Sequence, residues 1–408
     1  MIRLKSNKWI IISFFSLFIV AVLGVIMRYK IAFSFPFLDQ KNIQHAHSNF
    51  AFAGWISQTL FFFLTHSLRS LITEKRFMYY NYLLWANWVT ALGMLIFFML
   101  QGYGFYSILF SSLSILISFV FTIMFWPDIK HHPNIITRQW FKWALVFMLL
   151  SSLGTLSLTL MMATKNIHQH TYLASVYWYL HFQYNGWFFF GCMGLLYDYL
   201  GKRYAHFTTN RLAFRLIAYS CVPAYGLSIL WMHLPIWIEI VFALAALAQA
   251  LGWGNILFYA YKQKILKELD FIQPLKWLLV IIAIAGSIKF VLQLGSTIPA
   301  VSQLAFGFRS IVIAYLHLVL LAFISLFLVT YAYMTKLSIF NKYSFAGIAI
   351  FGVGILLNEL LLGIQGIASI GYILIPFINE SLFFVSLLLM SGIGIILMSQ
   401  FALPSKSN

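Results

Sequence analysis

Three histidines at regular intervals are the residues of this chain whose type and spacing best suit chemistry. His47, His181 and His317 are 134 and 136 residues apart, and one third of the 408-residue chain is 136 residues. Each lies in an apolar run long enough to cross a bilayer, where a histidine is costly and usually faces a bundle interior or binds a ligand. The spacing predicts three equivalent blocks, each with one histidine-bearing helix.

The first of these runs opens with two histidines, His45 and His47. A b-type haem needs one or two axial histidines on facing helices and an apolar slot between them. We therefore treat His45, His47 and His317 as candidate ligands of haem b. Two positions on a helix differ by about 200° of rotation, so both His45 and His47 bind one centre only if the helix begins irregularly. The alternative for this pair is an interfacial place beside the lipid headgroups.

Two further histidines, His181 and His233, are candidate metal ligands. For His181 the alternative is a hydrogen bond to a neighbouring helix, and for His233 it is an interfacial place at a helix end. The other histidines lie in loops or at the ends of runs, and we interpret them as solvated or interfacial: His66, His131, His132, His168, His170 and His206.

Charged residues within the apolar runs usually pair with one another or line a site. Arg309 lies eight residues before His317, about two helical turns nearer the outer surface. A guanidinium there suits a haem propionate, because it can donate two parallel hydrogen bonds to a carboxylate. The alternative is a pair of simple interhelical bridges, Arg309–Glu380 and Lys289–Glu239.

Composition assigns the chain to the polytopic membrane proteins. Hydrophobic residues make up 62% and charged residues 9%, whereas a soluble domain has about a quarter charged residues. We expect one integral membrane domain, residues 1–408, in a lipid bilayer, with the first run retained because it is longer than a signal-peptide core. The net charge of +17 is spread over short loops, so a nucleic-acid partner is not expected.

Apolar runs of the roughly 20 residues that a span requires number twelve. If the N-terminus is inside, every inner connection carries Lys or Arg, and the outer loops carry few charges, among them Arg28. This asymmetry predicts cytoplasmic termini and a bacterial inner membrane. The runs are centred near Phe18, Ile56, Leu92, Leu116, Leu150, Phe188, Ala224, Ala246, Ala283, His317, Leu356 and Leu388.

Twelve helices with histidines on the second, sixth and tenth resemble the catalytic subunit of the haem–copper oxidase superfamily. The segments that carry the resemblance are Trp178-Tyr179-Leu180-His181 and Leu230-Trp231-Met232-His233, and they are most similar to the cbb-type oxidase and nitric oxide reductase branch. The resemblance implies an all-α fold of three four-helix arcs, haem and copper cofactors, and dioxygen or nitric oxide as substrate. It also implies other respiratory subunits and a cytochrome or quinol electron donor as partners.

The departures from that family predict a divergent member whose catalytic residues are unknown. The family's tenth helix carries two histidines and this one carries His317 alone, while Leu234 stands where a second histidine would follow His233. We therefore expect a haem-binding protein that passes electrons and, if it is an enzyme, an oxidoreductase that does not pump protons. Two alternatives stay open, a non-catalytic haem sensor or carrier and a haem-free twelve-helix transporter. Transporters commonly repeat in halves, whereas this chain divides into thirds.

Overall fold

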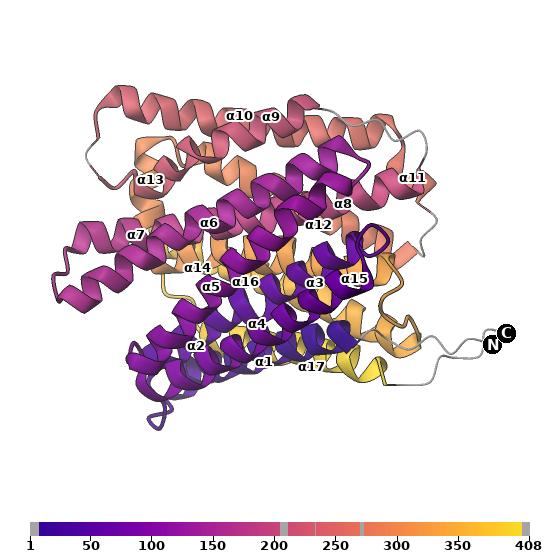
Figure 1. Cartoon of the computed structure of the whole chain (residues 1–408). Coiled ribbons are helices and arrows are strands. Elements are labelled where there is room, and N and C mark those ends of the chain that lie inside the picture. Colours follow the sequence, from indigo (N-terminus) through magenta and orange to yellow (C-terminus); the bar gives the residue numbers. More distant parts are fainter. Residues whose placement is uncertain (1–7, 205–210, 233, 270–272, 402–408) are drawn as a thin grey trace.

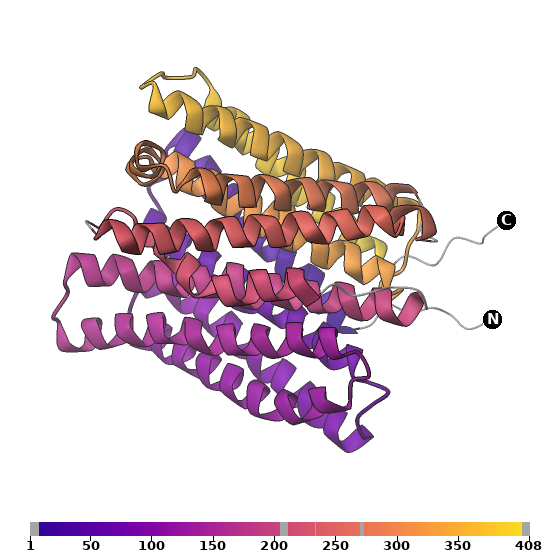
Figure 2. The same cartoon turned by 90° about the horizontal axis from the view of Figure 1, so that it is seen from above.

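A single bundle of helices makes up the part of the chain that can be described. The computed structural model describes residues 8–204, 211–232, 234–269 and 273–401, and all regular structure in these ranges is helical. The axes of the long helices are roughly aligned with one another through the bundle (Figure 1, Figure 2). The all-helical class predicted from composition is confirmed for these ranges.

Within the described ranges, nine helical segments are long and apolar enough to cross a membrane. They are α1 (Lys8–Phe33), α4 (Glu74–Gln101), α5 (Phe105–Asp128) with the 3₁₀ turn η2 (Ile129–His131), α6 (Ile135–Thr164), α10 (Ile236–Lys262), α12 (Gln273–Gly295), the segment Arg309–Met334, α16 (Lys342–Ile370) and α17 (Ile378–Ser399). A tenth is obtained if α9 (Arg211–Cys221) and the 3₁₀ helix η4 (Pro223–Ile229), which are bent by 48°, form one span. Two short helices, α11 (Ile265–Glu268) and α13 (Pro299–Gly307), lie in connections.

The three histidine-bearing segments share an unusual build, because each is interrupted by a π-helical stretch just after its histidine. The first is α2 (Gln40–Phe50), η1 (Ala51–Ser57) and α3 (Gln58–Ser67), and the second is α7 (Gln169–His181), η3 (Phe182–Phe188) and α8 (Phe189–Arg203). The third, Arg309–Met334, is α14 (Arg309–His317), η5 (Leu318–Ser325) and α15 (Leu326–Met334). Stretches of π-helix are rare and frequently mark functional sites.

The first two of these segments are not among the nine or ten spans found. Each contains a predicted span, but each opens with polar turns. The sequence of α2 is QKNIQHAHSNF, and α7 begins Gln-His-Thr-Tyr. The apolar run therefore begins well inside each segment. The segment as a whole is not one of the nine or ten apolar helices that could cross a membrane.

The three π-helical stretches meet at the centre of the bundle in a cyclic pattern. Trp55 of η1 donates through Nε1 to Ser325 Oγ of η5 at 2.9 Å. Trp187 of η3 donates in the same way to Ser57 Oγ of η1 at 3.0 Å. The third contact is apolar and joins η5 to the first residue of α8, directly after η3, with the rings of Phe323 and Phe189 stacked and their centroids 5.7 Å apart. The three histidine-bearing segments therefore contact one another in the interior of the bundle.

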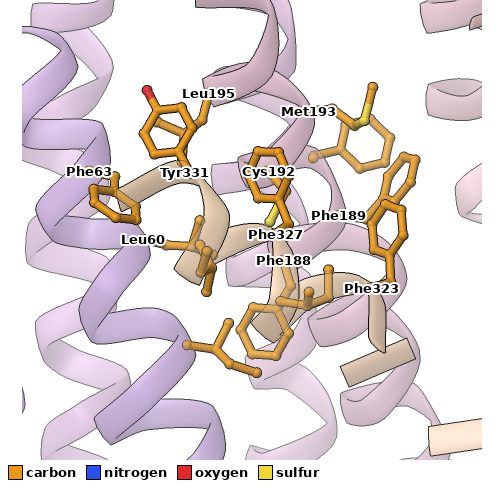
Figure 3. Close-up of a cluster of buried hydrophobic side chains, with 14 of the residues drawn as sticks. Leu60, Phe63, Phe188, Phe189, Cys192, Met193, Leu195, Phe323, Phe327 and Tyr331 are labelled. Atoms are coloured by element: carbon orange, nitrogen blue, oxygen red, sulfur yellow. The ribbon is translucent and has the colours of Figure 1, made fainter. Parts of the chain in front are cut away.

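Packing around this meeting point is dense and aromatic. Figure 3 shows side chains from α3, η3, α8, η5 and α15 in one buried cluster. Phe63 of α3 and Tyr331 of α15 contact edge to face, with centroids 4.9 Å apart. Contacts of this kind contribute about 0.5–1.5 kcal/mol beyond simple burial, so they help to fix the three histidine-bearing segments against one another.

One end of the bundle is held by a buried ion pair. His132 Nε2 lies 2.7 Å from Asp198 Oδ1, and Lys202 Nζ lies 2.9 Å from Asp198 Oδ2. Lys202 also donates to the carbonyl of Ser67 at 2.9 Å, which ties the ends of α3 and α8 to the turn after η2. The interpretation of His132 as interfacial is wrong, because this residue is only 2% exposed. Its partner Asp198 is one of just nine acidic residues in the chain, and that scarcity is the signal that sequence reasoning could have used.

Candidate functional site

His45 and His47 project from opposite faces of α2, as their spacing requires. The ring of His45 contacts Tyr103 edge to face at 4.6 Å between centroids and lies 6.1 Å from Phe98. Both aromatic residues belong to α4 or to the turn that follows it, and burial raises the pKa of Tyr103 to about 12. His45 therefore faces α4, away from the neighbouring histidine-bearing helices.

His47 instead faces α1, where two features accommodate its ring. The carbonyl of Val20 on α1 faces the imidazole. A Cβ atom added at Gly24 would lie 3.7 Å from His47 Cε1, an ordinary contact distance, so the ring packs directly beside this part of α1. The Nδ1 atom of His47 is buried and has no hydrogen-bond partner in the described part of the chain. Such an atom needs an explanation, and a missing ligand is one.

His317 lies near His47, close enough for the two rings to interact electrostatically. Its Nδ1 atom donates to the carbonyl of Ile313, one turn earlier in α14, at 2.9 Å. This bond fixes the ring and the tautomer, and it leaves Nε2 as the nitrogen that carries the lone pair. Histidines that bind metals characteristically hold their other nitrogen in this way.

Arg28 of α1 completes the group, because its charge reaches both His47 and His317. The sequence places Arg28 in an outer loop, but in the structure α1 extends to Phe33. No hydrogen bond or ion pair engages its guanidinium among the described residues. Arg28 is therefore a second candidate for the positive charge expected beside the histidine pair. Sequence reasoning missed it.

Arg309, the residue predicted for that role, has a partner within the protein. It donates through Nη2 to Gln44 Oε1 at 2.6 Å. The bond joins the start of α14 to α2, one turn above His47. The alternative bridge to Glu380 does not form, since the described residues contain no such ion pair.

Both ring nitrogens of His181 form hydrogen bonds within the protein. Its Nε2 donates to the carbonyl of Cys221 at 2.8 Å, and its Nδ1 accepts from the amide of Asn185 at 3.1 Å. The Cys221 carbonyl is available because the helix changes to 3₁₀ geometry there, and the Tyr225 N–H bonds to Val222 instead. His181 therefore stabilises the bend between α9 and η4, and neither ring nitrogen is left for a metal.

Lys289 of α12 lies beside this histidine in the interior of the bundle. The residue is 1% exposed, and its charge interacts electrostatically with His181 and Cys221. Its Nζ donates to Gln293 Oε1 at 2.7 Å and lies 3.8 Å from the centroid of the Phe290 ring. The alternative bridge to Glu239 does not form among the described residues.

The remaining predicted metal ligand, His233, lies outside the described residues. Among those residues, no group of three or more histidine, cysteine, aspartate or glutamate side chains is placed to hold a metal ion. The structure therefore brings His47 and His317 together and sets His45 and His181 apart from them.

A cavity of about 130 Å³, lined by both apolar and polar side chains, lies between the first two histidine-bearing segments and α4, α5 and α6. Hydroxyl and amide side chains line much of it, including Ser151, Ser152 and Thr155. Gln183 also lines it, and its buried Oε1 atom has no partner among the described residues. A space of this size and polarity suits a few water molecules or a small polar solute.

Comparison with protein-family models and with curated proteins gives no match to this chain. The functional argument therefore depends on the residues and their geometry.

Proposed function

We propose that this protein binds one haem b between α2 and α14 and serves in electron transfer within a membrane. The observation that carries the proposal is the pair His47 and His317, two imidazoles on neighbouring helices. Each presents a nitrogen without a protein partner in the described chain. The donor set fits the group, because two axial histidines suffice for a b-type haem. When bound, haem supplies reversible one-electron chemistry.

Different residues of the chain would have different roles in binding the haem. His47 and His317 would be the axial ligands, and the Ile313 carbonyl would keep the His317 ring oriented. Arg28, whose charge reaches both rings, would offset the negative charge of the propionates. The bond from Arg309 to Gln44 would hold the two ligand-bearing helices together, so that Arg309 acts as a positioning residue.

A second, copper-containing centre is less well supported by the geometry. Both nitrogens of His181 are hydrogen-bonded, and the charge of Lys289 acts on the same place, where it would oppose a second cation. Aromatic side chains also pack beside it, with the rings of Trp253 and Phe290 5.5 Å apart. These contacts favour electron transfer over dioxygen or nitric oxide reduction.

The proposal includes the finer architecture and setting expected from the sequence. It assigns twelve spans in three four-helix arcs, a bacterial inner membrane with both termini in the cytoplasm, and a cytochrome or quinol as electron donor. The shared α–π–α build of the three histidine-bearing segments supports the threefold organisation.

The decisive experiment is the optical spectrum of the purified protein, oxidised and reduced with dithionite. We expect the α-band of a low-spin haem b in the wild type and its loss in His47→Ala and His317→Ala. The matched control is His45→Ala, which removes an imidazole from the other face of α2 and should keep the band. Loss of the band in all three variants, with helicity unchanged, would contradict the assignment of ligands.

A haem-free transporter remains the second candidate, and the cavity lined by Gln183 favours it. A wild-type preparation without haem, made from cells supplied with haem precursors, would overturn the haem proposal and favour this reading. Uptake assays in proteoliposomes would then be the next measurement.

A further inference from the structure

A second, larger cavity of about 660 Å³ lies between α8, α10, α12 and α15. Its volume is within the range of small-molecule and cofactor sites. Most of its wall is apolar, with Leu196, Ile256, Val280, Phe327 and Met334 among the lining residues. Neither His47 nor His317 is among its lining residues.

The cavity ends among lysines at the end of the bundle that carries the His132–Asp198 pair. Lys262, Lys264 and Lys267 line it there, in the last turn of α10 and the connection to α12. All three are exposed, and none forms an ion pair with a described residue. Three unpaired ammonium groups next to an apolar cavity create a place for a molecule that is anionic at one end and apolar at the other.

The length of the cavity matches one leaflet of a bilayer. Its lining on α10 extends from Trp253, near the bundle centre, to Lys262. Nine residues of α-helix rise about 14 Å, which is about half of the roughly 30 Å hydrocarbon thickness. An acyl chain that entered beside the lysines would therefore end near the centre of the protein.

We infer that this cavity binds an anionic phospholipid, with an acyl chain against α8, α10 and α12 and the phosphate among Lys262, Lys264 and Lys267. Basic pockets between membrane helices commonly hold anionic headgroups. Leu269, which is 2% exposed, anchors the connection that carries two of the lysines and so keeps the mouth of the cavity formed.

The test compares thermal unfolding of the full chain in a nonionic detergent with added phosphatidylglycerol or with phosphatidylcholine of the same acyl chains. A ligand that binds only the folded state raises the unfolding midpoint. We expect phosphatidylglycerol to raise it by several degrees more than phosphatidylcholine does. We also expect one bound phosphatidylglycerol in native mass spectra.

The variant K262Q/K264Q/K267Q should lose this difference, because it removes the charges and keeps the chain length of the side chains. Its matched control is K75Q/K130Q/K342Q, which removes three exposed lysines that do not line the cavity and should keep the difference. Ala283→Phe, which places a ring in the cavity wall, should abolish the bound lipid while the lysines remain.

Three results would overturn the inference: equal stabilisation by both lipids, an unchanged difference in the lysine variant, or equal stabilisation by sodium phosphate alone. If the Ala283 variant does not fold, the lysine variant and its control still decide the question. None of these readouts involves haem, so their failure would leave the proposed function untouched.

Discussion

An imidazole nitrogen can bind a metal or form a hydrogen bond within the protein. The histidines of this bundle differ in which of these their nitrogens are free to do. His181 uses both nitrogens within the protein, whereas His47 and His317 each keep one without a partner among the described residues. His45 packs against aromatic rings. Four histidines that looked alike in the sequence therefore have three different environments.

His181 offers a test of this division that does not depend on haem. His181→Ala would leave the Cys221 carbonyl and the Asn185 amide buried without partners, and we expect it to lower the free energy of unfolding by about 1–3 kcal/mol. His181→Gln supplies a new side-chain donor and should recover part of that loss. Unfolding in SDS titrations measures both variants.

Copper analysis of the same samples is the measurement that would contradict a purely structural role for His181. A wild type that holds one copper per chain, together with copper-free His181→Ala and His181→Gln proteins, would show that the ring binds metal and that its hydrogen bonds rearrange.

The sequence predicted the orientation of single side chains where helical geometry alone determines it. A spacing of two positions predicts that His45 and His47 face apart, and they do. It was uninformative about His181, because its acceptor exists only where Pro223 and the 3₁₀ turn break the seventh helix. Arg28 was missed for a similar reason, since only the length of α1 places its charge near the histidines.

At the scale of elements, the π-helical stretches are the feature that sequence rules did not predict. Their residues are ordinary apolar and small side chains, and no residue pattern distinguishes a π turn from the α-helix around it. Helix starts have a clearer sequence signal, because polar caps mark them. Asn134 accepts from two backbone N–H groups of α6, and Asn341 forms a capping box with Ser344.

Gly186 in η3 tests how closely a π-helical stretch packs. A Cβ atom there would lie 2.5 Å from Phe147 Cβ of α6, and neither atom can move without its backbone. We expect Gly186→Ala to destabilise the fold by about 1–3 kcal/mol through overpacking.

Gly254→Ala is the matched control for this prediction, because nothing lies within 4 Å of the added atom. It should be neutral or stabilising by up to about 1 kcal/mol. Equal effects of the two substitutions in SDS titrations would show that the contact between η3 and α6 relaxes easily.

At the scale of the whole molecule, the basic loops give the bundle a preferred orientation in the membrane. The positive-inside asymmetry predicts that Lys130, after α5, is cytoplasmic and that Asn166, between α6 and α7, is on the other side. Both residues are exposed, and the two cysteines of the chain are buried. Single cysteines introduced at these two positions can therefore be distinguished by labelling.

We expect a membrane-impermeant maleimide to label Asn166→Cys in intact spheroplasts and to label Lys130→Cys only after lysis. The wild type, with Cys192 and Cys221 enclosed, is the control for background labelling. The reverse order of labelling would place the termini outside.

The π-helical stretches also bear on how the chain arose. Well under 1% of residues in proteins adopt π geometry, yet three stretches of it follow three histidines and begin at Ala51, Phe182 and Leu318. Three separate origins at matching places would be a poor explanation for so rare a feature. A single unit that already contained the widened turn, present three times in the chain, would account for all three.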